Sequence, residues 1–134
     1  KELEKEGLVL VKRHRIHNYP VYYANRDGEN FRFLKKIDNI SSLKESGLLD
    51  YMDNKLTPEA VVLFGSAARG EDTEESDLDL FVFSKEKKVD LGRYEKILKR
   101  KVNIFFSDNF IKLSPQLKNN ILNGIILKGY LKVF

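Results

Sequence analysis

Val61–Phe83, VVLFGSAARGEDTEESDLDLFVF, is the stretch on which the fold of this chain depends. A first apolar run ends at Gly65-Ser66, and a second one begins with two aspartates, Asp77 and Asp79, after a polar segment. Side chains alternate between the two faces of a strand, so both carboxylates project from one face and the leucines beside them from the other. Neighbouring carboxylates repel each other unless a proton or a cation lies between them. The stretch therefore predicts a site for a hard cation with oxygen ligands.

The turn at Gly65-Ser66 adds a phosphate-binding element to this site. Glycine lets the backbone approach a phosphate closely, and Ser66 offers a hydroxyl at the start of a short helix. Arg69 lies one helical turn further on, where a guanidinium can reach a phosphate oxygen. We therefore expect a nucleotide phosphate to bridge this turn and a metal on Asp77 and Asp79.

Length and composition limit the alternatives. The chain has 134 residues, enough for one domain with a small appendage, and is 42% hydrophobic and 33% charged. It has no cysteine, which excludes disulfides and thiolate metal sites, and its two histidines leave little for a zinc site. No run approaches the length of a membrane span and no signal-peptide pattern opens the chain, so we expect a cytoplasmic protein with no membrane partner. Because residue 1 is Lys, we also expect further sequence upstream.

The net charge of +4 is distributed unevenly. Residues 1–35 carry 8 basic and 5 acidic side chains, residues 36–84 carry 4 basic and 11 acidic, and residues 85–134 carry 12 basic and 4 acidic. The acidic block contains the two aspartates, which agrees with a cation site. The basic C-terminal block suits a surface that receives phosphates or nucleic acid, although a solvated surface explains most of its lysines equally well.

Residues 1–27 are predicted to form an appendage, with residues 28–134 as the main domain. A charged helix up to Gly7 precedes two β-rich runs, 8–11 and 20–23, joined by a basic segment with a turn near Asn18. This order resembles the last helix and wing of a winged helix-turn-helix domain, which implies DNA contact through Lys12, Arg13 and Arg15. For this fragment alone, an ordinary hairpin with a solvated polar tip is the favoured interpretation.

In the main domain, helical spacing begins at Phe31, after a turn around Asp27-Gly28. The capping box of residues 42–45 predicts that a second helix starts there, with Gly47 inside it. Thr57-Pro58 then breaks the pattern before a strand over residues 60–64.

The remaining pattern predicts a helix from about Asp90, a strand over residues 101–106 and a helix begun by Ser114-Pro115. A short strand or hairpin is expected in residues 125–134. The predicted fold class is therefore α/β (α+β), with a small mixed β-sheet flanked by helices and an N-terminal β-hairpin appendage.

Several of these residues also carry a family resemblance. Gly65-Ser66, Arg69-Gly70 and the segment Ser76–Leu80 are similar to the signature of the DNA polymerase beta-type nucleotidyltransferase superfamily, above all to its minimal nucleotidyltransferases. The resemblance spans about residues 58–127, and its last part, 120–127, is similar to the closing helix and strand of that family. Gly-Ser alone carries no information and Asp-x-Asp alone is a weak signal, but the two in register after a strand, with Arg69-Gly70 between them, are a strong one.

The resemblance implies a nucleotidyltransferase fold and the transfer of a nucleoside monophosphate from ATP or another NTP to a hydroxyl, with Mg²⁺ or Mn²⁺. It implies that Asp77 and Asp79 are metal ligands. It also implies that a nucleotide is bound by Gly65, Ser66, Arg69 and Ser76. Small members of this family often pair with a helical partner protein, so such a partner or a homo-oligomer is an expected form of association.

One position departs from the family pattern. Active members commonly have a third carboxylate on the next strand, where this chain has Asn103. An amide is a weak metal ligand and a poor general base, so the predicted catalytic set of Asp77, Asp79 and Asn103 is better suited to holding a nucleotide than to transferring it. Two functions stay open: an Mg²⁺-dependent nucleotidyltransferase, and a catalytically weak or inactive nucleotide-binding module linked to a DNA-binding winged helix.

Overall fold

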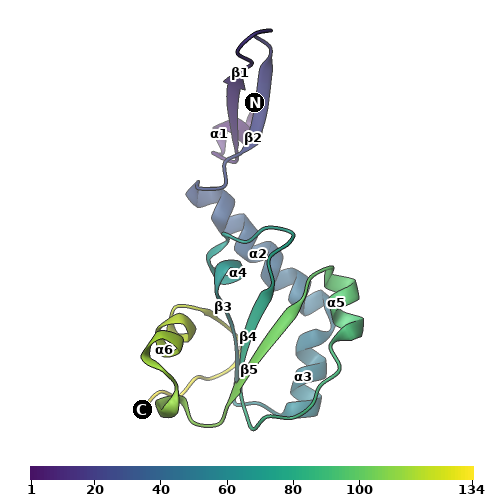
Figure 1. Cartoon of the computed structure of the whole chain (residues 1–134), viewed down its shortest axis with the longest axis vertical. Helices are drawn as coiled ribbons and strands as arrows, with labels where there is room; N and C mark the ends of the chain where they lie inside the picture. Colours follow the sequence, from purple (N-terminus) through teal and green to yellow (C-terminus); the bar gives the residue numbers. More distant parts are fainter.

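A four-stranded mixed sheet forms the centre of the computed structural model, which describes all residues 1–134 (Figure 1). Its strands are β3 (Ala60–Phe64), β4 (Leu78–Phe83), β5 (Val102–Ser107) and β6 (Ile125–Gly129), in the order β5-β4-β3-β6. β4 runs parallel to β5, whereas β3 is antiparallel to both β4 and β6. The predicted mixed sheet is confirmed, and the C-terminal segment contributes a strand to it.

Helices cover both faces of this sheet. On one face, side chains such as Leu63 and Leu80 are fully buried in a cluster with the apolar residues of α2 (Glu29–Ser46) and α3 (Leu48–Leu56), and α5 (Gly92–Leu98) packs against the same cluster. On the other face, Phe81 packs with the short helix η1 (Phe110–Lys112) and with α6 (Pro115–Leu122). The alternation of β4 therefore directs its leucines to the first layer and its odd-numbered side chains to the second.

The first two long helices divide at a different residue from the predicted one. We expected a helix to start at the capping box around Ser42, but Ser42 lies inside α2, which continues to Ser46. Gly47 adopts the left-handed conformation, with φ of 86°, and so separates α2 from α3 instead of lying within a helix. The capping box is not used because the buried side of α2 runs on through Asn39, Leu43 and Ser46.

The N-terminal half of α2 has an uncovered apolar face. Phe33, Leu34 and Ile37 continue the helical spacing that begins at Phe31, yet their exposed fractions are 59%, 48% and 44%. Figure 1 shows the reason: this half of α2 extends past the end of the sheet, toward the N-terminal segment. Only the C-terminal half of the helix packs on the core.

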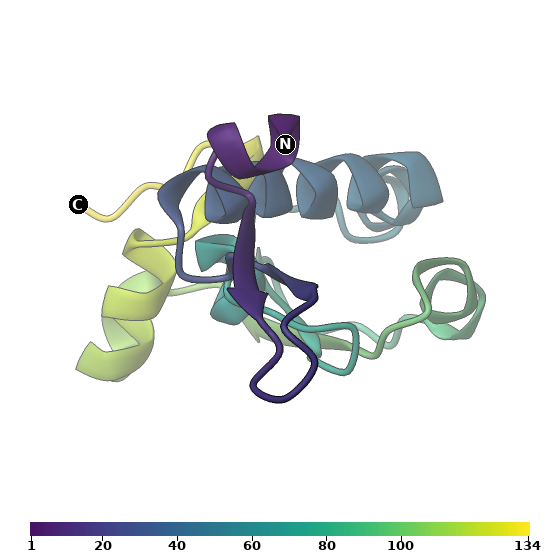
Figure 2. The same cartoon turned by 90° about the horizontal axis from the view of Figure 1, so that it is seen from above.

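The N-terminal segment forms a hairpin of its own, which lies in front of the sheet domain in Figure 2. It consists of α1 (Glu2–Lys5) and the antiparallel strands β1 (Val9–Arg13) and β2 (Pro20–Ala24), which pair only with each other. Asn18, with φ of 54°, makes the predicted turn. The side-chain amides of Asn25 and Asn30 attach the segment by donating to the carbonyls of Gly7 and Glu6, at 2.7 Å each. The boundary at residue 27 stays a prediction.

The other predicted elements agree with the structure. A short helix, α4 (Ser66–Arg69), follows the glycine turn. The Ser114 hydroxyl accepts a hydrogen bond from the Leu117 N–H at 3.2 Å and so caps α6, as Ser114-Pro115 predicted. No helix of the chain combines the length and the apolar character that crossing a bilayer requires.

Candidate functional site

Three polar side chains meet where β4 and β5 begin. The parallel register places Asp79 beside Asn103, and Asp77 immediately precedes β4. The Asn103 Nδ2 atom donates one hydrogen bond to Asp77 Oδ2 at 3.1 Å and another to Asp79 Oδ1 at 3.0 Å. The structure thus brings together the three side chains that the sequence predicted as a catalytic set.

The two carboxylates have no cationic partner in the protein. Asp77 is exposed and Asp79 is half-buried, and neither forms an ion pair with a lysine, arginine or histidine. Their mutual repulsion is reduced only by the amide N–H groups of Asn103. The site therefore carries negative charge that the chain itself does not balance.

The donor set suits one hard cation. Two carboxylates are oxygen ligands of the kind that Mg²⁺ and Mn²⁺ accept, and Mg²⁺ is commonly held by one or two carboxylates together with substrate phosphates. No cluster of three or more His, Cys, Asp or Glu side chains suited to a metal is present, so the third carboxylate is missing in space as well as in sequence. A cation bound by Asp77 and Asp79 would have to take its other ligands from water or substrate.

Gly65 brings the turn after β3 against this site. Its φ of 77° lies in the region that favours glycine, and a Cβ at this position would lie 2.7 Å from Asp79 Oδ2. Two independent features therefore require glycine at position 65: its positive φ and the close approach of Asp79. The turn and the carboxylates are adjacent, as the sequence predicted, and the half-buried Ser66 follows directly.

Two of the predicted nucleotide-binding side chains make other contacts. Arg69 Nε donates to Glu71 Oε1 at 2.6 Å, and this hydrogen bond lowers the pKa of Glu71 below its ordinary value. The Ser76 hydroxyl accepts a hydrogen bond from the Thr73 N–H at 2.9 Å, within the loop between α4 and β4. Nucleotide contacts by Arg69 and Ser76 stay predictions.

The loop that carries Asp77 is held by a buried polar network that the sequence did not reveal. Asp72 has no solvent exposure, and its Oδ1 accepts a hydrogen bond from Asn39 Nδ2 at 2.9 Å. Its Oδ2 lies 2.8 Å from Arg100 Nη1 and 3.7 Å from Lys35 Nζ. Two cations and an amide therefore compensate one buried carboxylate, as burial of a charge requires.

Arg100 also reaches the other end of the same loop. Its Nε donates to the Ser76 carbonyl at 2.9 Å. The main-chain carbonyl of the next residue, Lys101, accepts a hydrogen bond from the Leu78 N–H, also at 2.9 Å. These contacts hold the backbone on both sides of Asp77. No local pattern indicated this role, because Arg100 lies in a lysine-rich run and Asp72 in an acidic one, and both runs are typical of solvated surface.

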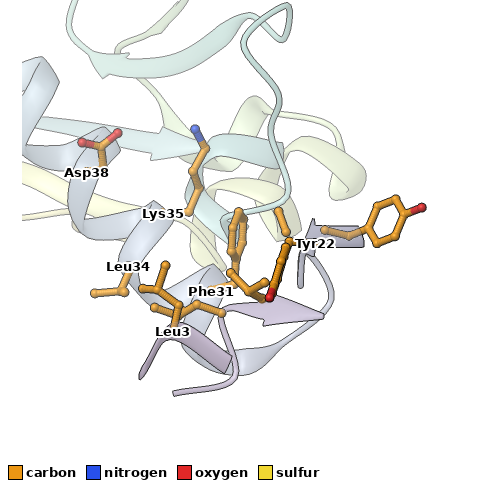
Figure 3. A pocket seen from close by; sticks show the side chains of 10 residues that line it. Leu3, Tyr22, Phe31, Leu34, Lys35 and Asp38 are labelled. Carbon is orange, nitrogen blue, oxygen red and sulfur yellow. The ribbon is translucent and has the colours of Figure 1, made fainter. Parts of the chain in front are cut away.

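The main apolar cavity lies away from the carboxylates, between the hairpin and α2 (Figure 3). It has a volume of about 470 Å³ and is open on one side. Apolar side chains make up most of its wall, with Lys35 and Asp38 as the polar ones. The labelled apolar residues are Leu3, Tyr22, Phe31 and Leu34. It contains none of the residues of the carboxylate site.

Comparison with known proteins agrees with this geometry. The family described as "Nucleotidyltransferase domain" matches residues 45–128, which include Gly65, both aspartates and Asn103. The chain belongs to this family. As a nucleotidyltransferase domain, it is of the class of transferases that move nucleotidyl groups.

A solved structure shows a weaker likeness to this nucleotidyltransferase domain. It is the crystal structure of a protein from Sulfolobus solfataricus, provisionally assigned as a nucleotidyltransferase. The two chains share 20% sequence identity, and the alignment covers 76% of this chain and 94% of the other with a TM-score of 0.41. No curated protein sequence matches the chain.

Proposed function

We propose that the chain transfers a nucleoside monophosphate from ATP or another NTP to a hydroxyl group, with Mg²⁺ or Mn²⁺ held by Asp77 and Asp79. The observation that carries this proposal is the pair of carboxylates without a cationic partner, placed against the Gly65 turn in a nucleotidyltransferase domain. Elsewhere the chain supplies cations to its buried carboxylate, Asp72. An uncompensated pair beside a phosphate-binding turn suits a metal nucleotide as the missing counter-charge.

In the transfer step, the acceptor oxygen forms a bond to the α-phosphorus, and the bond from that phosphorus to the β-phosphate oxygen breaks. Pyrophosphate leaves with the bonding electron pair, and the acceptor proton passes to solvent. Bound at Asp77 and Asp79, a divalent cation would neutralise charge on the phosphate oxygens. The Gly65 backbone and the Ser66 hydroxyl would orient the triphosphate beside it. Asn103 cannot take the acceptor proton, because a neutral amide is a poor base, and we therefore expect slow turnover.

An assay with ATP labelled at the α-phosphate tests this function over a panel of hydroxyl acceptors. The label is expected to move to an acceptor as pyrophosphate is released, and Asp77→Ala and Asp79→Ala should each abolish transfer. Calorimetry should show ATP binding that requires the divalent metal and is lost in both variants. ATP binding without metal that both substitutions leave unchanged would contradict the site assignment.

The alternative function is a nucleotide-binding module with little or no turnover, joined to a DNA-binding element. The amide at Asn103 favours weak turnover. The charge and the position of the hairpin favour DNA binding. Residues 7–26 contain no acidic side chain and include Lys12, Arg13 and Arg15, which are all exposed. The hairpin also projects away from the sheet domain, so its tip is accessible to a duplex (Figure 1).

A gel-shift experiment with the whole chain and duplex DNA tests this alternative. Binding at low salt should fall steeply as salt rises, because basic side chains displace counter-ions from phosphates. Neutralising Lys12, Arg13 and Arg15 together should remove it, whereas neutralising three exposed lysines of the loop after β4, Lys85, Lys87 and Lys88, serves as the matched control. No shift at low salt would contradict DNA binding by the hairpin.

A further inference from the structure

The position of the Asn103 amide between the two aspartates has a chemical consequence. Both N–H groups of Nδ2 are engaged, one with Asp77 Oδ2 at 3.1 Å and one with Asp79 Oδ1 at 3.0 Å. An ionised carboxylate only accepts hydrogen bonds, so the amide must turn its nitrogen, and not its oxygen, toward the pair. In this orientation Asn103 presents donors where a metal ligand has to present a lone pair.

The arrangement makes Asn103 a substitute for a cation, not a third ligand. Its two N–H groups carry partial positive charge and occupy one oxygen of each carboxylate, Asp77 Oδ2 and Asp79 Oδ1. A cation that enters this space must break two charge-assisted hydrogen bonds, which are stronger than hydrogen bonds between neutral groups. The Asn103 amide must then rotate or form hydrogen bonds with other groups.

We propose that Asn103 cross-links Asp77 and Asp79 as an internal counter-group that a divalent cation has to displace. This inference rests on the proposed function of the same site, and it adds a specific property to it. The cation alone binds weakly, and the phosphate oxygens of a nucleotide, which supply further ligands, are needed to offset the lost amide contacts. Asn103 thus makes tight metal binding depend on the presence of a nucleotide.

The counter-group role and a ligand role predict opposite effects on metal affinity when the Asn103 side chain is removed. If Asn103 contributed its carbonyl oxygen to the cation, removal of the side chain would weaken metal binding. If Asn103 is the counter-group, its removal frees both lone pairs and restores the repulsion between the carboxylates, which the cation then relieves. Asn103→Ala should therefore bind the metal more tightly than the natural chain.

The experiment is a calorimetric titration of the whole chain with Mn²⁺ alone, followed by the same titration with a non-hydrolysable ATP analogue present. Without nucleotide, Asn103→Ala and the similarly sized Asn103→Leu are expected to bind Mn²⁺ about tenfold more tightly than the natural chain, and Asn103→Asp more tightly still. With the nucleotide analogue, the advantage of Ala and Leu should shrink. Asn120→Ala, an exposed asparagine of α6 without a side-chain hydrogen bond, should leave binding unchanged.

Three outcomes overturn the inference. Mn²⁺ binding by Asn103→Ala and Asn103→Leu that is equal to or weaker than that of the natural chain shows that Asn103 is a bystander or a ligand, while nucleotidyl transfer can still stand in its own assay. Absence of Mn²⁺ binding by every variant in both titrations, Asn103→Asp included, overturns both this inference and the metal-dependent function. A natural chain that binds Mn²⁺ equally well with and without nucleotide also contradicts the counter-group role.

Discussion

Two aspartate–asparagine pairs in this protein make nearly the same contact in very different surroundings. Asn39 Nδ2 lies 2.9 Å from Asp72 Oδ1, and Asn103 Nδ2 lies 3.0 Å from Asp79 Oδ1. The first pair is buried and is joined by the guanidinium of Arg100 at 2.8 Å. The second pair is open to solvent. Its third member is another carboxylate, that of Asp77, and not a guanidinium.

Under the proposed function, the same two kinds of side chain have a structural role in the first pair and a ligand-binding role in the second. Burial of an unpaired charge is costly, and the fold compensates the buried Asp72 carboxylate with Arg100, Lys35 and the Asn39 amide, without any ligand. At the solvent-facing site water screens the repulsion between the carboxylates of Asp77 and Asp79, so the fold can leave their charge unbalanced. A cation from solution can therefore act at the second pair and not at the first.

The largest expected effect follows from breaking the buried network. Arg100→Ala leaves Asp72 without its main counter-charge and removes the donor to the Ser76 carbonyl. Because the Arg100 side chain is 11% exposed and Asp72 not at all, the free energy of unfolding should fall by about 3–5 kcal/mol. Urea denaturation measures the loss, with Arg93→Ala, an exposed arginine of α5, as the control. A loss below about 1 kcal/mol would show that the network is not a structural unit.

Gly65→Ala tests how closely the turn approaches the solvent-facing pair. The Cβ meets Asp79 Oδ2 in addition to the strain of a positive φ, whereas Gly7, with φ of 75°, has nothing within 4 Å of the same position. Both variants should lose about 1 kcal/mol or more of stability from the backbone term, and Gly65→Ala the larger amount. Only Gly65→Ala should also lose metal-dependent ATP binding in calorimetry. Equal losses in both variants would contradict the close approach.

Asp77→Asn tests the unbalanced charge itself. Since no cationic side chain pairs with Asp77, the free energy of unfolding should change by less than about 0.5 kcal/mol, or rise slightly as repulsion with Asp79 disappears. The same substitution should abolish metal-dependent nucleotide binding. Thermal denaturation and calorimetry on one preparation measure both effects. A substantial loss of stability would show that Asp77 has a structural role like that of Asp72.

The smallest effect is expected at Glu71, the exposed carboxylate beside the buried network. Its hydrogen bond from Arg69 lowers its pKa in the folded chain from the ordinary value of 4.5. A carboxyl group with a depressed folded pKa stabilises the protein above its unfolded pKa, and that contribution disappears as the pH falls through the folded pKa. Glu71→Gln should therefore lower stability slightly at pH 7 and not at about pH 2, with Glu74→Gln, an exposed glutamate of the same loop, as the control. Denaturant midpoints at the two pH values measure it.

Local sequence patterns predicted that Gly65, Asp77 and Asp79 lie near one another, but they did not indicate the contacts of Asp72. Strand alternation and the glycine turn are local, so Gly65, Asp77 and Asp79 could be assigned to one site before the fold was known. The contact between Asp72 and Arg100 joins residues 28 apart, and nothing in the local pattern distinguishes these two residues from their charged neighbours. The helix boundary near Ser42 was wrong for a similar reason: tertiary burial of Leu43 outweighed a local capping motif.

Arg26 decides where the hairpin can be separated from the rest of the molecule. Its Nη2 donates to the main-chain carbonyl of Asp72 at 2.8 Å, from the short linker that precedes α2. A fragment that begins at Arg26 retains this contact, whereas one that begins at residue 28, the boundary that the sequence suggested, removes it. A graft of another appendage onto this domain would likewise keep this hydrogen bond only if a donor side chain remained at position 26.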